Sequence, residues 1–307
     1  MSLLAVGTVA FDTIETPFGR AERVLGGSAT YITLAARQIT SDVRLVGVVG
    51  GDFPVHHIDM LKKHGVDTEG LVIEPNGQTF FWAGRYHYDL NQRDTLATHL
   101  NVLADFKPNL PERYRDSRIV CLGNLDPGVQ LAVLDQIHNP EIVILDTMNF
   151  WIQNTPEVLK QVLKRIDVLI VNDAEARELT GEPNLVRAAR AIREMGPETL
   201  VIKKGEHGAL LFCDDTIFSA PAYPLEDIQD PTGAGDAFMG GFAGYLDRIA
   251  TGAPGDFRRA VVLGSALASF VVEAFGPERL IKLEEGALEH RLEAFHALSS
   301  IPEAILA

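Results

Sequence analysis

Cysteine, basic residues and long apolar runs are all scarce in this chain of 307 residues. Its two cysteines, Cys121 and Cys213, stand far apart and belong to no Cys-x-x-Cys or Cys/His grouping, so we expect two buried free thiols. Lysine and arginine number 27 against 42 acidic residues, a formal charge of −15, which argues against a nucleic acid or an anionic membrane as the partner. No stretch approaches the roughly 18 consecutive apolar residues of a membrane span, and no basic segment precedes the first apolar run, so we expect a cytoplasmic protein.

Two common nucleotide-binding motifs are absent as well. The chain has no Gly-x-x-x-x-Gly-Lys-Ser/Thr phosphate loop, and no Gly-x-Gly-x-x-Gly follows its first strand-like segment. These absences count against a P-loop enzyme and against a nicotinamide dehydrogenase. Hydrophobic residues make up 46% of the sequence, which is enough for a large core. Because no linker, low-complexity tract or internal repeat divides the chain, we expect residues 1–307 to form a single domain.

Short apolar segments alternate with helix-like segments along most of the chain. Buried strands that alternate with helices are typical of a mostly parallel sheet covered by helices on both faces. The sequence therefore predicts an α/β fold. Strands are expected at 3–7, 43–49, 118–122, 141–145, 168–171 and 199–202, and helices at 28–37, 55–64, 128–137, 156–164, 174–179 and 185–195.

Two segments break this alternation. Residues 78–88 are dense in aromatic and β-prone side chains with no helix between them, and a shorter β-like piece at 12–23 follows the first strand. Both are expected to form antiparallel β-structure. We expect a small lid, built from about 12–24 and 71–100, over the carboxyl edge of the main sheet, where open α/β sheets bind ligands.

The most informative run is the segment Asp-Pro-Thr-Gly-Ala-Gly-Asp-Ala-Phe that starts at Asp230. Gly233, Ala234 and Gly235 lack bulky side chains, so their backbone N–H groups can converge on an anion at the start of a helix expected at 237–246. Asp236 lies beside that anion site, where a carboxylate would repel phosphate but could accept a proton from a substrate hydroxyl. The alternative is that the glycines only pack a turn and Asp236 caps the helix.

This run closely resembles the C-terminal signature of the ribokinase-like (PfkB) sugar and nucleoside kinases, and the resemblance extends over nearly the full length. It implies a ribokinase-like fold, ATP as the phosphoryl donor, Mg²⁺ as the metal, and a homodimer formed through the lid. It also implies a K⁺ site, because Asp230 matches a position that holds a monovalent cation in many relatives. Backbone carbonyls near Gly276 would supply further ligands. The alternative is that Asp230 is an ordinary turn residue before Pro231.

Three features match the family's acceptor site. Gly26 and Gly27 resemble its Gly-Gly sugar-binding turn, in which a polar ligand can approach the backbone. Asp12 matches the Asp that accepts hydrogen bonds from two substrate hydroxyls, the alternative being a solvated turn residue. Tyr31 stands where the family commonly has Asn. Its ring could stack on a substrate or narrow the pocket, or it could simply pack under the lid.

Two more residues are candidates for substrate contact. Asn124 follows the strand at 118–122 and could reach the substrate from the sheet edge. Arg85 in the lid could clamp an acidic or phosphorylated substrate, next to the alternating side chains of 86–88. The alternative is that this part of the lid only packs or pairs with another subunit.

The nucleotide side is implied by two further motifs. Asn172 and Glu175 match the family's Asn-x-x-Glu motif, in which Glu175 would hold Mg²⁺ through water and Asn172 would orient that shell or cap a helix. Lys203, Gly205 and Gly208 resemble the Thr-x-Gly-x-x-Gly nucleotide loop, with Lys203 in place of the usual Thr. This lysine could contact nucleotide phosphate or project into solvent.

Together these patterns predict an ATP-dependent kinase that transfers the γ-phosphoryl group to a primary alcohol of a sugar or a nucleoside. Asp236 would be the base, and the amides of residues 233–235 would form the anion hole. A regulator that binds a nucleotide or metabolite without catalysis is the alternative from another class. The intact Asp236, Asn172 and Glu175 argue against that regulator.

Overall fold

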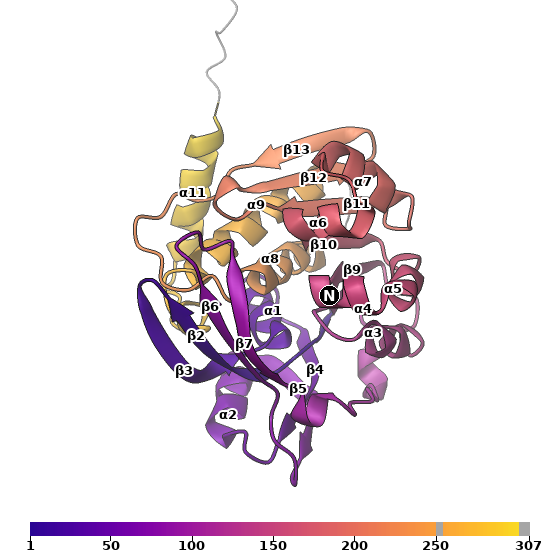
Figure 1. Cartoon of the computed structure of the whole chain (residues 1–307), viewed down its shortest axis with the longest axis vertical. Coiled ribbons are helices and arrows are strands. Elements are labelled where there is room, and N and C mark those ends of the chain that lie inside the picture. Colours follow the sequence, from indigo (N-terminus) through magenta and orange to yellow (C-terminus); the bar gives the residue numbers. More distant parts are fainter. Residues whose placement is uncertain (250–253, 301–307) are drawn as a thin grey trace, which may run out of the picture.

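Nine strands form a central sheet within residues 1–249 and 254–300, which the computed structural model describes (Figure 1). The strand order is β13-β12-β11-β10-β9-β8-β1-β4-β5, and neighbouring strands are parallel except for the two pairs that involve β12. The prediction of a mostly parallel sheet is confirmed. The strands are β1 (Leu3–Val6), β4 (Val43–Gly50), β5 (Val66–Glu74), β8 (Ile119–Leu122), β9 (Ile142–Asp146), β10 (Val168–Asn172), β11 (Thr199–Lys203), β12 (Ala209–Cys213) and β13 (Thr216–Ala220).

Helices cover both faces of this sheet because side chains alternate along each strand. In β1, Leu4 and Val6 pack on the side of α3, α5, α6 and α7, whereas Leu3 and Ala5 pack on the side of α1, α8 and α9. Both cysteines are buried free thiols in the second of these cores, as predicted. The helices are α1 (Ser28–Arg37), α2 (Val55–Lys63), α3 (Pro127–Leu134), α4 (Asn149–Asn154), α5 (Pro156–Leu163), α6 (Asp173–Thr180), α7 (Leu185–Arg193), α8 (Ala234–Ile249), α9 (Pro254–Val271), α10 (Glu278–Ile281) and α11 (Ala287–Ser299).

A smaller sheet stands beside the central one (Figure 1). In the described part of the chain it has four strands in the order β3-β2-β6-β7: β2 (Ala10–Thr16), β3 (Gly19–Gly26), β6 (Phe81–Tyr86) and β7 (Arg93–His99). Two of its strand pairs are antiparallel, and β2 and β6 run parallel. Residues 71–74, expected in the lid, instead belong to the central sheet, because β5 continues its parallel pairing with β4 up to residue 74.

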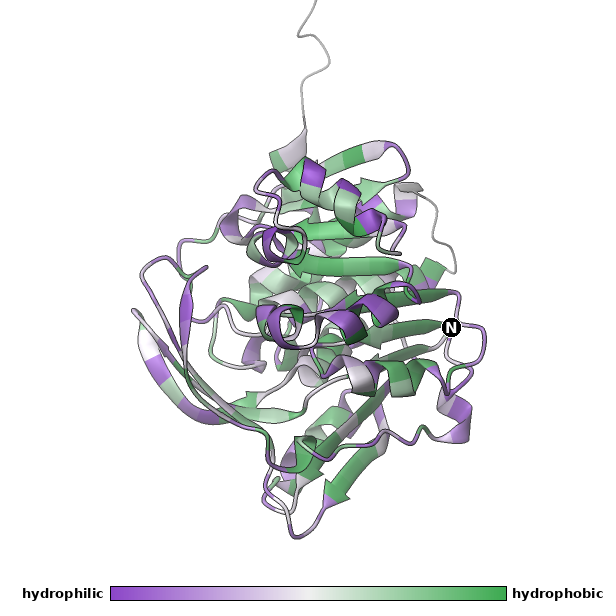
Figure 2. Cartoon of the chain, turned by 45° about the vertical axis from the view of Figure 1, so that its right-hand side comes forward, coloured by the Kyte–Doolittle hydropathy of each residue, from purple (hydrophilic) through white to green (hydrophobic). Residues whose placement is uncertain are grey.

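The lid is fixed to the rest of the protein at its base. Only three residues separate the end of β1 from the start of β2, so the lid begins at the carboxyl edge of the central sheet. A third apolar core, which includes Phe11, Leu25 and Leu34, joins lid strands to α1 and α2. Figure 2 shows that the strands of the central sheet are hydrophobic along most of their length. No helix within residues 1–249 and 254–300 has both the length and the apolar character to cross a membrane.

Candidate active site

Three polar side chains end three neighbouring strands of the central sheet. Asp146 is the last residue of β9, Asn172 of β10 and Lys203 of β11. Asn172 is directly opposite Lys203 in the parallel register of β10 and β11, and β9 is parallel to β10. The three residues therefore share the carboxyl edge of the sheet, where the sequence predicts ligand binding.

Lys203 connects these strands with the start of α8. Its Nζ atom lies 3.4 Å from Asp146 Oδ2, and a Cβ atom placed on Gly235 would come within 2.8 Å of the same Nζ. Burial alone lowers the pKa of the Lys203 ammonium, but the surrounding carboxylates outweigh that effect and raise it above its ordinary value. Lys203 thus stays charged and lies among carboxylates rather than in solvent. These carboxylates are Asp146, Glu175 and Asp236.

The carboxyl groups around Lys203 hold their protons more tightly than ordinary acids do. Loss of hydration is the main cause and the charge of Asp146 is the next, and together they raise the pKa of Asp236 and that of Glu175 to about 7. Burial likewise raises the pKa of Asp146. Asp236 is half-buried on the first turn of α8. A carboxyl group with a pKa near neutrality is well suited to exchange a proton with a substrate hydroxyl.

Asn172 and Glu175 form a reciprocal capping box at the start of α6. The Glu175 N–H donates to Asn172 Oδ1, and the Asn172 N–H donates to Glu175 Oε2, each at 2.8 Å. The capping alternative is therefore present in the structure. A helix cap does not need to be buried beside a second acid. Glu175 is, because burial raises its pKa most and the charge of the nearby Asp146 raises it further.

The chemistry of these carboxylates fits a hydrated magnesium ion. Within residues 1–249 and 254–300, no three His, Cys, Asp or Glu side chains are grouped so that they could hold a metal ion directly. Mg²⁺ keeps several waters and is commonly bound through one or two carboxylates and substrate phosphates. The raised pKa values of Glu175 and Asp146 show a site that would accept additional positive charge.

The loop before α8 presents free backbone amides. Gly233 has a φ of +80°, in the left-handed region that favours glycine. The Ala234 N–H donates to Pro231 O at 3.2 Å. By contrast, the N–H groups of Gly235 and Asp236 have no acceptor in the described part of the chain. These two amides at the positive end of α8 are available to an anion.

Asp230 is completely buried at the base of this loop. Its Oδ1 accepts a hydrogen bond from the Thr232 N–H at 2.8 Å, and its Oδ2 accepts one from the Gly276 N–H at 3.3 Å. Burial raises the pKa of Asp230 to about 6 despite these hydrogen bonds. Gly276 is therefore close to Asp230, and the contact that the structure shows is made by its N–H group.

On the acceptor side, Asp12 of the lid faces the substrate turn. Asp12 is buried, and a Cβ atom on Gly26 would come within 1.9 Å of Asp12 Oδ2, so only glycine fits beside this carboxyl group. Gly27 has a φ of +94° at the start of α1. Burial, followed by the charges of Asp230 and Asp236, raises the pKa of Asp12 to about 8. The structure thus brings the proposed acceptor and phosphoryl-transfer residues into one electrostatic cluster.

Tyr31 lies inside this cluster. Its side chain is 1% exposed, and its hydroxyl group has no hydrogen-bond partner within residues 1–249 and 254–300. Burial, Asp230 and Asp12 all raise its pKa well above the ordinary value of a phenol. A buried polar group without a partner is uncommon in a folded protein, so the Tyr31 hydroxyl is a candidate contact for a ligand.

The nucleotide loop lies under the tip of the lid. A single 3₁₀ turn spans Gly205–His207, and the Lys204 N–H donates to Gly208 O at 2.7 Å. Asn91, between β6 and β7, packs on this loop, because a Cβ atom on Gly205 would come within 1.9 Å of Asn91 Oδ1. The lid hairpin of β6 and β7 therefore extends from β2, which carries Asp12, to the nucleotide loop at Gly205.

Two of the predicted substrate contacts, Arg85 and Asn124, have protein partners in the structure. Arg85 is 55% exposed, and its Nε donates to Glu15 Oε2 at 2.7 Å, which directs it away from the site. Asn124 follows β8 as expected, but Trp151 Nε1 donates to its Oδ1 at 2.9 Å and its own Nδ2 lies 3.0 Å from the sulfur of Met148. Arg85 therefore projects away from the acceptor site, whereas Asn124 lies just past the carboxyl end of β8 with both ends of its amide in contact with protein groups.

Sequence reasoning missed Asp146 and Arg93. Asp146 follows four apolar residues of β9, and a charged residue at the carboxyl end of a buried strand is the signal that could have revealed it. Arg93 begins β7 and is one of the cations whose charge acts on Asp146 and Asp236. No local pattern distinguishes Arg93 from Arg85, because the difference depends on which face of the lid each side chain occupies.

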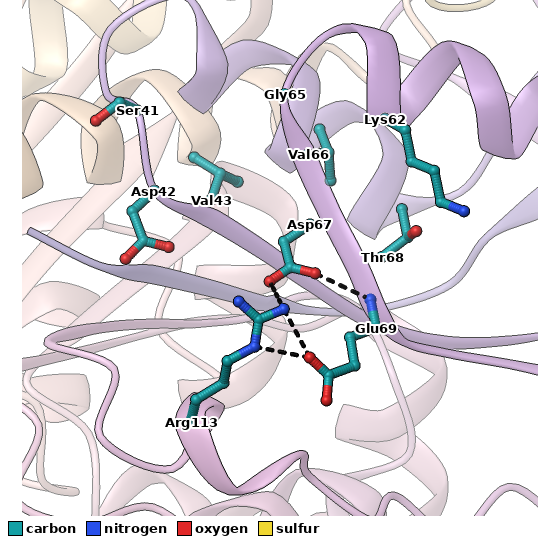
Figure 3. A pocket seen from close by; sticks show the side chains of 10 residues that line it. All are labelled: Ser41, Asp42, Val43, Lys62, Gly65, Val66, Asp67, Thr68, Glu69 and Arg113. Carbon is teal, nitrogen blue, oxygen red and sulfur yellow. Dashed lines mark hydrogen bonds and ion pairs between the residues drawn. The ribbon is translucent and has the colours of Figure 1, made fainter.

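A hollow of about 700 Å³ lies at the opposite edge of the central sheet (Figure 3). It is lined by Val43 and Val66, which are the first residues of β4 and β5. Arg113 crosses it and contacts Asp67 and Glu69 (Figure 3). This hollow is therefore at the amino edge of the sheet, away from the carboxylate cluster.

Comparison with known proteins agrees with the fold. The family model described as pfkB family carbohydrate kinase matches residues 5–282, nearly the whole chain. The chain belongs to this family, whose members are sugar and nucleoside kinases.

Individual relatives include a cytidine kinase of Thermococcus kodakarensis, 30% identical over 80% of this chain and 88% of the relative. A nucleoside kinase of Methanothermobacter thermautotrophicus is 26% identical over 90% of this chain and 91% of the relative. Among solved structures, the nucleoside kinase of Burkholderia thailandensis in complex with inosine has a TM-score of 0.76 at 20% identity and covers 96% of this chain and 99% of that one. This last likeness concerns the fold.

Proposed function

We propose that this protein transfers the γ-phosphoryl group of ATP to a primary alcohol of a nucleoside, with sugars as the competing acceptor class. The observation that carries the proposal is Asp236, a carboxyl group with a pKa of about 7 on the first turn of α8. Beside it are two backbone amides without an acceptor in the described part of the chain. A proton acceptor next to an anion site is the arrangement that phosphoryl transfer to an alcohol requires.

Asp236 acts as the base in this proposal. Its ionised form accepts the proton of the acceptor hydroxyl as the oxygen attacks the γ-phosphorus and the bond to the leaving ADP oxygen breaks. Lys203 lowers the pKa of Asp236, against the effects of burial and of Asp146, and so keeps part of the population ionised near neutral pH. Asp236 in its ionised state is therefore the reactive form.

The anion hole is formed by the loop of residues 233–235 and the first turn of α8. Free N–H groups at this helix terminus stabilise the charge on the transferring phosphoryl group. Lys203 supplies a fixed positive charge within the same cluster, and Gly205 and Gly208 shape the loop for the nucleotide. When bound, Mg²⁺ would neutralise phosphate oxygens. Glu175 and Asp146 would hold its water shell, and Asn172 fixes the position of Glu175 by capping the start of α6.

Asp12, Gly26, Gly27 and Tyr31 position the acceptor. Asp12 has a pKa of about 8, so it is largely protonated at neutral pH and can both donate to one substrate hydroxyl and accept from another. Tyr31 offers a hydroxyl group that has no partner in the described part of the chain. Nucleosides are the favoured class because two relatives that span most of this chain are a cytidine kinase and a nucleoside kinase.

Asp230 is the proposed K⁺ ligand. It is a buried carboxylate with a pKa of about 6, raised by burial, and such a group gains from a nearby cation. Each of its oxygens accepts a backbone N–H in the structure, and a carboxylate has further lone pairs for a metal. Activity in potassium compared with choline salts at equal ionic strength tests this site.

The lid is also the proposed contact of a homodimer. It exposes apolar side chains, among them Phe18 at 51% and Leu96 at 48%. Sedimentation of the wild type and of a variant with both residues changed to serine would measure the association.

The central test is ADP release, measured by a coupled assay over a panel of nucleosides and simple sugars with Mg²⁺ and ATP. At least one nucleoside should be phosphorylated with a higher kcat/KM than any sugar. Asp236→Asn should retain ATP binding and lose turnover by on the order of 10²-fold or more. ATP binding without turnover for any acceptor would favour the non-catalytic regulator, and near-normal turnover of the Asn variant would remove Asp236 from its role.

A further inference from the structure

The inner face of the lid carries an arginine other than the one expected from the sequence. Arg93 is directly opposite Tyr86 in the antiparallel register of β6 and β7, and residues in direct register project from the same face of a sheet. Arg85 precedes Tyr86, so it projects from the other face. Its ion pair with Glu15 at 2.7 Å on that face agrees with this assignment. Arg93 therefore shares the face of Tyr86.

That shared face is turned toward the phosphoryl-transfer loop. Tyr86 is 7% exposed, and its hydroxyl group lies 3.1 Å from Thr232 Oγ1. Thr232 in turn donates its N–H to Asp230, in the loop that leads to Gly233. The residue across the strand from Arg93 thus contacts the loop whose amides are proposed to bind the phosphoryl group.

The tip of the same hairpin contacts the nucleotide loop. Asn91, two residues before Arg93, packs on Gly205 at a distance that would exclude a Cβ atom there. Hydrogen bonds from Asn91 lower the pKa of Asp89 in the same hairpin tip, and the nearby His207 ring in the nucleotide loop lowers it further. Arg93, whose side chain is exposed, therefore belongs to a hairpin that contacts both the nucleotide loop and the phosphoryl-transfer loop.

Arg93 has the chemistry of an anion-binding residue. Its Cζ atom lies 6.0 Å from the centre of the Trp82 ring, and within residues 1–249 and 254–300 it makes no ion pair with a carboxylate. Burial raises the pKa values of Asp236 and Glu175, and Arg93 is among the cations that oppose this rise, so its charge is felt at the site. A guanidinium group presents several N–H donors in a planar fork that matches phosphate oxygens.

We propose that Arg93 contacts the β- and γ-phosphate oxygens of the nucleotide and stabilises the transferring phosphoryl group, an inference that rests on the proposed kinase function. In the step itself, the acceptor oxygen forms a bond to the γ-phosphorus, the bond from that phosphorus to the bridging oxygen of ADP breaks, and Asp236 takes the acceptor proton. Arg93 offsets the negative charge on the phosphate oxygens as these bonds exchange.

The test compares three arginines of the lid. Arg93→Gln removes the proposed contact, Arg85→Gln removes the cation on the outer face, and Arg20→Gln is the control, since Arg20 is exposed and paired with Glu15 and Glu22. We expect Arg93→Gln to lower kcat by about 10²-fold or more, with the other two variants within about twofold of the wild type. Arg93→Lys should recover only part of the loss, because an ammonium group cannot form the planar fork.

Two further measurements make the result decisive. Added guanidinium ion should restore part of the turnover of Arg93→Ala and none of that of Asp236→Asn. Calorimetric binding of Mg·ATP should weaken at least about tenfold in Arg93→Gln and remain unchanged in Arg20→Gln, and equal melting temperatures would show that the variants fold. If Arg93→Gln binds Mg·ATP and turns over as Arg20→Gln does, the assignment is wrong. An inactive wild type that still loses Mg·ATP binding in Arg93→Gln would refute the kinase function alone.

Discussion

The ring of Tyr31 packs directly against Gly233, so that a Cβ atom on Gly233 would lie 2.3 Å from Tyr31 Cζ. Tyr31 lies near the start of α1, beside the Gly26–Gly27 turn proposed to hold the acceptor, and Gly233 belongs to the loop proposed to bind the phosphoryl group. The proposed acceptor site and the proposed phosphoryl-binding loop are therefore in van der Waals contact through these two residues. A change in either residue is expected to affect the other.

The first prediction concerns Gly233→Ala. An alanine there adopts an unfavourable φ of +80°, a cost of about 1–2 kcal/mol, and also overlaps the Tyr31 ring. We expect a larger fall in the free energy of unfolding than for Gly286→Ala, because Gly286 has a φ of +81° and no neighbour within 4 Å of its Cβ position. Urea unfolding of both variants measures the difference, and equal destabilisation would contradict the contact.

The second prediction separates the two interpretations of Tyr31. Its hydroxyl is buried without a partner in the described part of the chain, which costs about 1–3 kcal/mol in the free protein. Tyr31→Phe should therefore raise the free energy of unfolding by about 1 kcal/mol. If the hydroxyl binds the acceptor, the same variant should raise the acceptor KM by about tenfold while the KM for ATP stays constant.

Tyr114→Phe is the matched control for this measurement. Tyr114 is also fully buried, but its hydroxyl donates to Asp67 O at 3.1 Å, far along the sheet from Tyr31. Removing a satisfied hydrogen bond should lower the stability by about 1 kcal/mol and leave KM unchanged. A Tyr31→Phe variant that is stabilised with unaltered KM would show that Tyr31 only packs under the lid.

The fold and the order of the site motifs could be predicted from the sequence because both depend on local signals. The apolar strands, the helix starts and the glycine loop at 233–235 are each encoded within a few residues. Asp236 and the capping pair of Asn172 and Glu175 lie where those signals place them.

The parts that could not be predicted depend on the pairing of distant strands. The register of β6 with β7 decides that Arg93, not Arg85, faces the site, and the pairing of β4 with β5 moves residues 71–74 out of the lid. The environment of Lys203 also could not be predicted from neighbouring residues in the sequence. Its position among carboxylates follows from the adjacency of β9, β10 and β11 in the sheet.

The third prediction uses this environment of Lys203. Asp236 must be ionised to accept a proton, so kcat should fall as the pH decreases through its pKa of about 7. Lys203 lowers that pKa, and Lys203→Thr, which restores the residue common in the family, should therefore shift the acidic limb of the profile to higher pH. Lys160→Thr is the control, because Lys160 is paired with Glu157 on the surface of α5. Profiles of kcat from pH 5 to pH 9 would show the shift, and a Lys203→Thr limb that coincides with the wild type would contradict it.

The fourth prediction links Asp12 to the stability of the free protein. Its pKa is about 8 in the folded state, against the ordinary value of 3.8 for an aspartate in an unfolded chain, so between these values the folded chain binds a proton that the unfolded chain has released. Unfolding then releases that proton, and the stability must fall as the pH rises from about 4 to about 8. Asp12→Asn removes the ionisation, so its melting temperature should exceed that of the wild type by an amount that grows between pH 5 and pH 8.5. Asp135→Asn, at an exposed carboxylate paired with Arg165, should show no such growth. A constant difference between Asp12→Asn and the wild type across this range would show that Asp12 ionises in the folded protein as easily as in the unfolded chain.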